Sequence, residues 1–189
     1  MPFTVITPPP EEPILLAEAK KHVRASHNSD DALLQGLIAA ARIHVEQVCE
    51  RAIVSQTWQL QLDEFPASGC PIELPGGLVT AVTTVEYTDT AGDTQTLAVQ
   101  KDIASQPARI APLPGASWPT AQTALAAVRI TYQVGWPDRE SVPEAIKSAM
   151  KLIIGTLYEH REEVVVGATA VELPFAVKHL LWPYRRVVL

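Results

Sequence analysis

Apolar residues near the N-terminus recur with the period of a helix. Residues 15–25 predict a short helix, since Leu16, Ala19 and Val23 fall on one face. A longer run follows, in which three- and four-residue spacing joins Leu34, Leu37, Ile38, Ala41, Val45 and Val48. This run predicts a second amphipathic helix over about residues 30–50. Its first turn holds two aspartates, which suit the positive end of a helix dipole.

From about residue 55 to 134 the pattern shortens to an alternation typical of half-buried strands. In residues 56–62 apolar side chains alternate with glutamine, and residues 128–132 alternate again as a last strand. Thr90–Asp93 predicts the tip of a hairpin between residues 82–87 and 94–99. The stretch from 109 to 119 is interrupted by proline. Together these segments predict a small antiparallel β unit, either a sandwich or a barrel.

Helical periodicity returns after Pro137. Ser141 and Glu144 have the spacing of a capping box, which predicts Ser141 as the N-cap of a helix reaching about His160. Residues 173–182 predict a final short helix that ends at Pro183. The expected fold is therefore α+β, a bundle of two N-terminal and two C-terminal helices with an inserted β unit. The expected domains are an N-terminal arm with helices (1–53), the β unit (54–136) and the completing helices (137–189).

Proline also shapes the start of the chain. Four prolines at positions 8, 9, 10 and 13 predict an extended arm without helix, because proline fixes φ and restrains the preceding residue. Such an arm can lie on the body of the protein or reach a neighbouring molecule, and the sequence leaves both open.

Composition narrows the class of protein. The 189 residues include 15 Lys and Arg against 21 Asp and Glu, and 47% are apolar, which is typical of a folded acidic protein. No apolar run is long enough to span a membrane, and the N-terminus lacks the pattern of a signal peptide. Cys49 and Cys70 are expected to be reduced thiols in the cytosol. Residues 54–136 hold three basic and seven acidic side chains, so the excess negative charge falls mainly in the β unit.

Candidate chemistry is sparse. His27 with Asp30 and Asp31 has no standard ligand spacing, so no metal site is expected. No nucleophile elbow, phosphate-binding loop or zinc-protease motif is present, and we expect neither catalysis nor a cofactor. Two other functions stay open at this stage. One is a helix-turn-helix regulator, although the basic Lys20, Lys21 and Arg24 lie on the first helix. The other is a non-catalytic β-sandwich binding module.

Several segments, in a fixed order, resemble the head-tail connector, or adaptor, proteins of long-tailed bacteriophages, prophages and gene transfer agents. Leu15–Lys20 is similar to the family's opening helix, and residues 30–46 are similar to its long second helix. Gln56–Trp58 with Leu62–Pro66 resembles the entry to the inserted β unit. The later segments that carry the resemblance are Val134–Trp136, Val142–Lys147, Leu157–Glu162, Leu173–Pro174 and Leu180–Arg185.

The resemblance implies a structural role in a virion assembled in the bacterial cytoplasm. Members of the family form a ring, usually of twelve subunits, below the portal of a DNA-filled head. The ring extends the DNA channel and provides a platform for the next neck or tail protein. The implied partners are thus other copies of the chain, the portal, a downstream neck or tail protein and passing DNA, which is not bound sequence-specifically. A membrane is not implied.

Two segments are candidates for the contacts such a role requires. Val164, Val165 and Val166 form a short apolar stretch beside Gly167, which either pairs with a neighbouring subunit's sheet edge or packs on its own bundle. The C-terminal Trp182, Tyr184, Arg185 and Arg186 combine the residue types that dominate interface energetics and are candidates for docking to the portal. A simple C-terminal cap on the bundle is the alternative for this segment.

Overall fold

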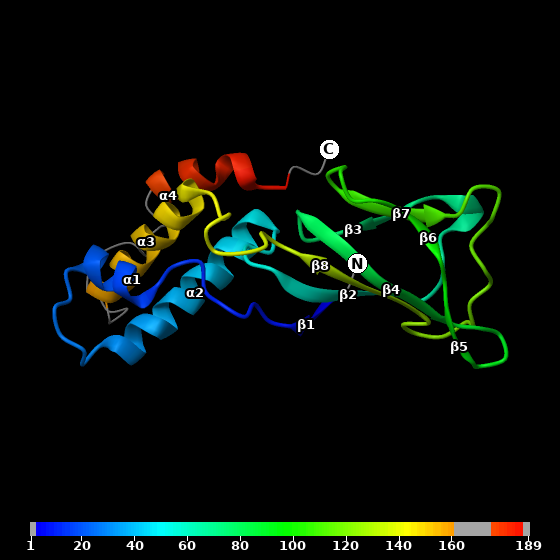
Figure 1. Ribbon diagram of the computed structural model, residues 1–189, viewed down its shortest axis with the longest axis horizontal. Coiled ribbons are helices and arrows are strands. Elements are labelled where there is room, and N and C mark those ends of the chain that lie inside the picture. Colours follow the sequence, from blue (N-terminus) through cyan, green and yellow to red (C-terminus); the bar gives the residue numbers. More distant parts are fainter. Residues whose placement is uncertain (1–2, 161–174, 187–189) are drawn as a thin grey trace, which may run out of the picture. The chain divides into compact units, whose positions relative to one another are not determined.

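The computed structural model describes residues 3–160 and 175–186 (Figure 1). Within these ranges the chain is α+β, with four α-helices and two antiparallel sheets. Its internal contacts divide it into two units. The described residues up to Pro10 belong with Ser55–Pro137 to a β unit, and Glu11–Val54 belongs with the described residues from Asp138 onward to a helical unit. No helix in the described part of the chain is long and apolar enough to cross a membrane.

The β unit contains a five-stranded and a three-stranded antiparallel sheet (Figure 1). In spatial order the larger sheet consists of β1 (Phe3–Thr7), β2 (Gln56–Leu62), β8 (Val128–Val134), β4 (Val79–Thr88) and β5 (Thr94–Thr96). The smaller sheet consists of β3 (Ile72–Leu74), β7 (Ala108–Pro112) and β6 (Val99–Asp102). Neither sheet of the described residues closes into a barrel, because β1 and β5 are two separate edges. The described residues therefore form no closed barrel.

The alternating pattern positions the core of the β unit. Trp58 of β2 lies opposite Tyr132 of β8, and both side chains are buried on the same face of the sheet. The Tyr132 hydroxyl donates a hydrogen bond to the Pro75 carbonyl oxygen at 3.0 Å, which satisfies its polar end inside the core. Burial raises the pKa of this phenol. The predicted hairpin is confirmed, since β4 and β5 pair around residues 89–93.

The N-terminal arm is a strand of the larger sheet. Phe3 of β1 pairs in register with Leu60, and its ring stacks on Trp58 with centroids 4.2 Å apart. The arm therefore lies on its own chain, which decides the question that the prolines left open. It also joins the β unit, whereas the sequence had grouped it with the helices. Strand β7 was not predicted either. It ends at Pro112, where a missing N–H is tolerated.

The helical unit comprises α1 (Leu16–Val23), α2 (Asp31–Cys49), α3 (Glu144–Glu159) and α4 (Phe175–Leu181). Helix α3 contacts each of the other three helices (Figure 1). Its core face holds Ile146, Met150 and Ile153, and the core face of α2 holds Leu34, Ile38, Ala41 and Val45. Burial of these apolar side chains, each contributing about 1.5–3 kcal/mol, holds the unit together.

The start of α3 differs from the prediction. Helix α3 begins at Glu144 and its N-cap position is Pro143, so Ser141 is not the cap. The backbone N–H and the hydroxyl of Ser141 instead both donate to Asp138 Oδ1, at 2.7 and 2.6 Å. Proline at the N-cap supplies no side-chain acceptor, and its fixed φ favours entry into a helix immediately after it. Val142 and Pro143 thus separate the predicted cap from the helix.

Candidate docking surface

The C-terminal segment of the described chain exposes aromatic side chains. In α4, Val177 and Leu181 are one helical turn apart and both are buried. Phe175 and Trp182 lie on the side away from these anchors and are 76% and 68% exposed. Large exposed aromatic side chains are unusual on a protein that acts alone, so this segment is the leading candidate for a docking surface.

Cationic and aromatic groups meet on this surface. The Arg185 guanidinium lies 5.7 Å from the centre of the Trp182 ring, which is within the range of a cation–π interaction. The rings of Phe175 and His179 meet edge to face, with centroids 4.2 Å apart. Phe175, Lys178, His179 and Trp182 line a shallow, open and mainly apolar hollow. We call this set, with Arg185, the C-terminal patch.

The structure brings together only part of the predicted docking set. Trp182 and Arg185 belong to the C-terminal patch, but Tyr184 and Arg186 are half-buried. The Arg186 backbone N–H donates to the Cys49 carbonyl oxygen at 3.1 Å, which ties the end of the segment to α2. Phe175, Lys178 and His179 were not predicted. The helical spacing of Phe175, His179 and Trp182 was the signal that could have identified them.

The other predicted interface lies outside the described residues. Val164, Val165 and Val166 fall in the undescribed range 161–174. Pairing of this stretch with a neighbouring subunit therefore stays a prediction from sequence.

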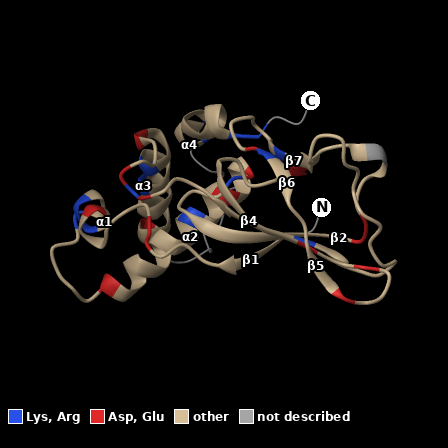
Figure 2. Cartoon of the chain, turned by 45° about the vertical axis from the view of Figure 1, so that its right-hand side comes forward, with Lys and Arg blue, Asp and Glu red and all other residues tan. Residues whose placement is uncertain are grey.

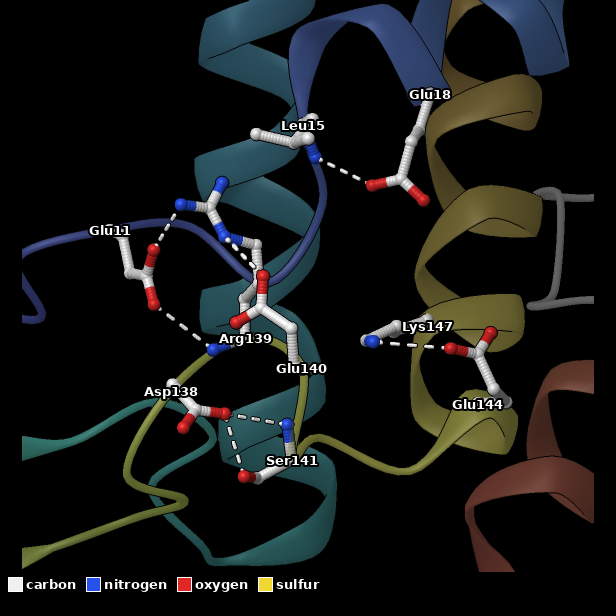
Figure 3. A network of polar contacts seen from close by, with 9 residues as sticks. All are labelled: Glu11, Leu15, Glu18, Asp138, Arg139, Glu140, Ser141, Glu144 and Lys147. Atoms are coloured by element: carbon white, nitrogen blue, oxygen red, sulfur yellow. Dashed lines mark hydrogen bonds and ion pairs between the residues drawn. The ribbon is translucent and has the colours of Figure 1, made fainter.

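A polar network holds the helical unit where the chain enters it from the β unit (Figure 3). Glu11 is the first residue of this unit. Its carboxylate accepts a hydrogen bond from the Arg139 backbone N–H at 3.0 Å and forms an ion pair with the Arg139 guanidinium. Arg139 is the second residue after the later junction. The pair therefore fastens two entry points of the chain to each other inside one unit.

The same network shifts two carboxylate pKa values. The Ser141 hydroxyl and backbone N–H lower the pKa of Asp138. The Leu15 backbone N–H donates to Glu18 Oε2 at 2.9 Å and lowers the pKa of Glu18, assisted by Lys151, although partial burial opposes this effect. Glu18 accepts from the N-cap residue of α1, and Asp138 accepts from the turn that precedes α3. Their chemistry is therefore that of positioning groups.

The candidate metal ligands have other partners. The Ser29 hydroxyl lies 2.6 Å from His27 Nδ1, Asp30 accepts from the Tyr158 hydroxyl at 2.6 Å, and Asp31 pairs with Lys20 at 2.6 Å. Among the described residues no three His, Cys, Asp or Glu side chains converge as metal ligands would.

The second helix offers no free cation to a phosphate backbone. Its one Lys or Arg residue is Arg42, which is bound by Glu12 and Glu46 at 2.9 Å each. Burial alone would lower the pKa of Arg42, but the hydrogen bonds that it donates to Glu12 and the negative charges of Glu46 and Glu12 raise it on balance. A helix-turn-helix protein needs donors on its second helix that can reach DNA. The arrangement disfavours that alternative.

Comparisons with known proteins agree with one another. Residues 13–93 match the family described as phage gp6-like head-tail connector proteins. The fold matches a chain from the neck of an empty gene transfer agent particle computed with C6 symmetry, with a TM-score of 0.81 and 27% identity over 100% of this chain and 97% of that one. No curated protein matches the sequence significantly.

Two further solved structures match over the same lengths, 100% of this chain and 97% of the other. A chain from the virion of a native gene transfer agent particle gives a TM-score of 0.82 at 25% identity. A chain from the neck of a native particle computed with C12 symmetry gives 0.81 at 26% identity. The family match over residues 13–93 and the shared fold over the whole length lead to one conclusion: this chain resembles the phage gp6-like head-tail connector proteins, and its role is that of a structural connector.

Proposed function

We propose that this connector assembles into a ring beneath the portal, extends the DNA channel and provides the platform to which the tail attaches. The observation that carries the proposal is the match of the whole chain to chains of neck assemblies with C6 and C12 symmetry. The protein would then be part of the virion at the head-tail interface after assembly in the bacterial cytoplasm. In this arrangement the N- and C-terminal helices complete one bundle, and the β unit is an insertion in it.

Imaging tests the ring directly. Concentrated protein, alone and mixed with the portal protein, is examined by negative-stain electron microscopy and native mass spectrometry. We expect closed rings, with twelve subunits as the leading stoichiometry, in at least the sample with portal. A protein that stays monomeric in both samples contradicts the proposal.

We further propose that the C-terminal patch docks to the portal. Trp182 and Arg185 are exposed together, and Trp and Arg are enriched among the residues that dominate interface energy. Trp182→Ala should weaken portal binding by about tenfold or more while leaving the fold intact, because this side chain is 68% exposed. Leu125→Ala is the control, since Leu125 is 88% exposed in the other unit and should leave binding unchanged. Equal affinities for the two variants would refute this docking role.

Val165 provides a separate test of subunit pairing. We propose that Val164–Val166 pairs with a neighbouring subunit's sheet edge, which is one of the two roles that its apolar sequence suits. Val165→Asp should then block ring formation while the monomer retains its circular dichroism spectrum. Ring formation equal to that of the unsubstituted protein contradicts the pairing.

The charges of the β unit suit DNA that passes without being held. Figure 2 shows few positions coloured for Lys or Arg along the strands. Lys101 Nζ donates to the Val82 carbonyl oxygen, and Arg109 pairs with Asp102 at 2.9 Å. Because phosphate binding depends on available cations, we expect little affinity for duplex DNA. An electrophoretic shift that disappears with added salt would contradict this expectation.

A further inference from the structure

Helix α2 has an outer face that carries no Asp, Glu, Lys or Arg. A surface helix of a globular protein normally places charged side chains opposite its core face. On α2 that position is taken by Leu33, Gly36, Leu37, Ala40, Ile43 and His44, which we call the α2 stripe, and by the uncharged Gln47 beyond it. Leu33 is 40% exposed and Ile43 is 47% exposed.

The charges that α2 does contain are directed elsewhere. Asp31 pairs with Lys20, and Arg42 pairs with both Glu12 and Glu46. All of these partners belong to the helical unit itself. The charged side chains therefore serve to hold α1, α2 and the preceding segment together, and none of them solvates the α2 stripe.

Two further features favour close approach of another surface. A Cβ added at Gly36 would meet nothing within 4 Å, so the backbone is open to a partner there. At about 1.5 Å of rise per residue, the 19 residues of α2 extend roughly 28 Å, which is long enough for a substantial contact.

We propose that the α2 stripe is the surface through which one copy of this chain packs against the next copy in the ring, an inference that rests on the proposed function. A closed ring needs a head-to-tail contact, in which each subunit offers two different faces. Chains of this fold occur in neck assemblies with C6 and C12 symmetry, so a second copy is available as the occupant. Because the stripe carries no charge, packing against that copy leaves none of the stripe's own side chains as an unpaired buried charge.

Charged substitutions test the contact. Leu33→Glu and Ile43→Glu place a carboxylate in the stripe and should raise the protein concentration needed for half-maximal assembly by about tenfold or more. Leu157→Glu is the matched control, because Leu157 of α3 is 42% exposed in the same unit and lies outside the stripe. The control should assemble like the unsubstituted protein, and all three variants should keep its thermal midpoint within about 3 °C.

Footprinting of the unsubstituted protein gives an independent measurement. Hydroxyl-radical labelling of Leu33 and Ile43 should fall when monomer becomes ring, while labelling of Leu157 should stay the same. Unchanged labelling, or normal assembly of the Leu33→Glu and Ile43→Glu variants, overturns the proposal while the ring itself stands. Destabilised monomers would show that the chain covers the stripe itself, and also overturn it. If the unsubstituted protein forms no ring, the proposed function is refuted, and there is then no neighbouring copy to cover the α2 stripe.

Discussion

Arg42 and Glu12 form a two-point contact across 30 residues of sequence. Nε of Arg42 donates to Glu12 Oε2 at 2.9 Å, and Nη2 donates to Oε1 at 3.3 Å. Nη1 of the same guanidinium donates to Glu46 Oε2 at 2.9 Å, while the other oxygen of Glu46 accepts the Ile53 backbone N–H at 3.0 Å. One arginine thus joins the segment before α1, the middle of α2 and the turn after it.

Removal of this guanidinium should destabilise the helical unit. Arg42→Met keeps the apolar stem but leaves the mostly buried Glu46 carboxylate without its cation, so the free energy of unfolding should fall by about 2–4 kcal/mol. Arg109→Met is the control, because the Arg109–Asp102 pair is largely exposed and should cost less than about 1 kcal/mol. Urea denaturation measures both, and equal losses would contradict the structural role of Arg42.

Gly76 meets two constraints at once. Its φ is +103°, and a Cβ there would lie 2.6 Å from Cζ3 of Trp58 and 2.9 Å from Cγ2 of Val134. Gly76→Ala should therefore destabilise the β unit by about 2–4 kcal/mol, because it adds a clash to backbone strain. Gly92→Ala isolates the strain, since φ is +93° but nothing lies within 4 Å, and should cost about 1 kcal/mol. Similar thermal shifts for the two variants would argue against the clash.

The two cysteines should differ in reactivity. Burial raises the pKa of the Cys49 thiol to about 11, and its side chain is inaccessible in the core at the end of α2. Cys70 is exposed. Since the thiolate is the reactive form, native protein at about pH 8 should incorporate one equivalent of iodoacetamide, at Cys70, and a second only after denaturation. Mass spectrometry of the intact protein provides the count, and rapid native modification of Cys49 contradicts the prediction.

Glu18 should make the free energy of unfolding depend on pH in the acid range. Its folded-state pKa is lower than the unfolded value near 4.3, so its contribution is present above that value and is lost as pH falls through the folded pKa. Glu18→Gln should therefore flatten the decline in unfolding free energy between about pH 5 and pH 3. Glu64→Gln, which removes an exposed carboxylate, serves as the comparison. Identical pH profiles for Glu18→Gln and the unsubstituted protein would exclude this role for Glu18.

Local periodicity was sufficient for much of the fold. Spacing within residues 30–50 predicted α2 to within a residue at each end, and alternation in residues 56–62 predicted β2 at its observed bounds. These patterns succeed because the side chains that define them are at most four residues apart. The prediction for Ser141 failed although a capping box is equally local, because Asp138 accepts the Ser141 backbone N–H that Glu144 would accept in such a box.

The candidate surfaces were less predictable. Trp182 and Arg185 could be chosen by residue type, but the half-burial of Tyr184 and Arg186 depends on how the segment returns to α2. The α2 stripe shows the same limit. Its residues are visible in the sequence, yet only the structure shows that the charges beside them pair within the unit.

The sequence by itself determined the helices, the main strands of the larger sheet and the resemblance to connector proteins, because each depends on neighbouring residues or on the order of short segments. Only the tertiary structure decided that the N-terminal arm pairs with β2 and that Arg42 meets Glu12. These features join residues tens of positions apart. Strand edges and charged groups can accept several alternative partners, and the packing of the whole chain selects among them.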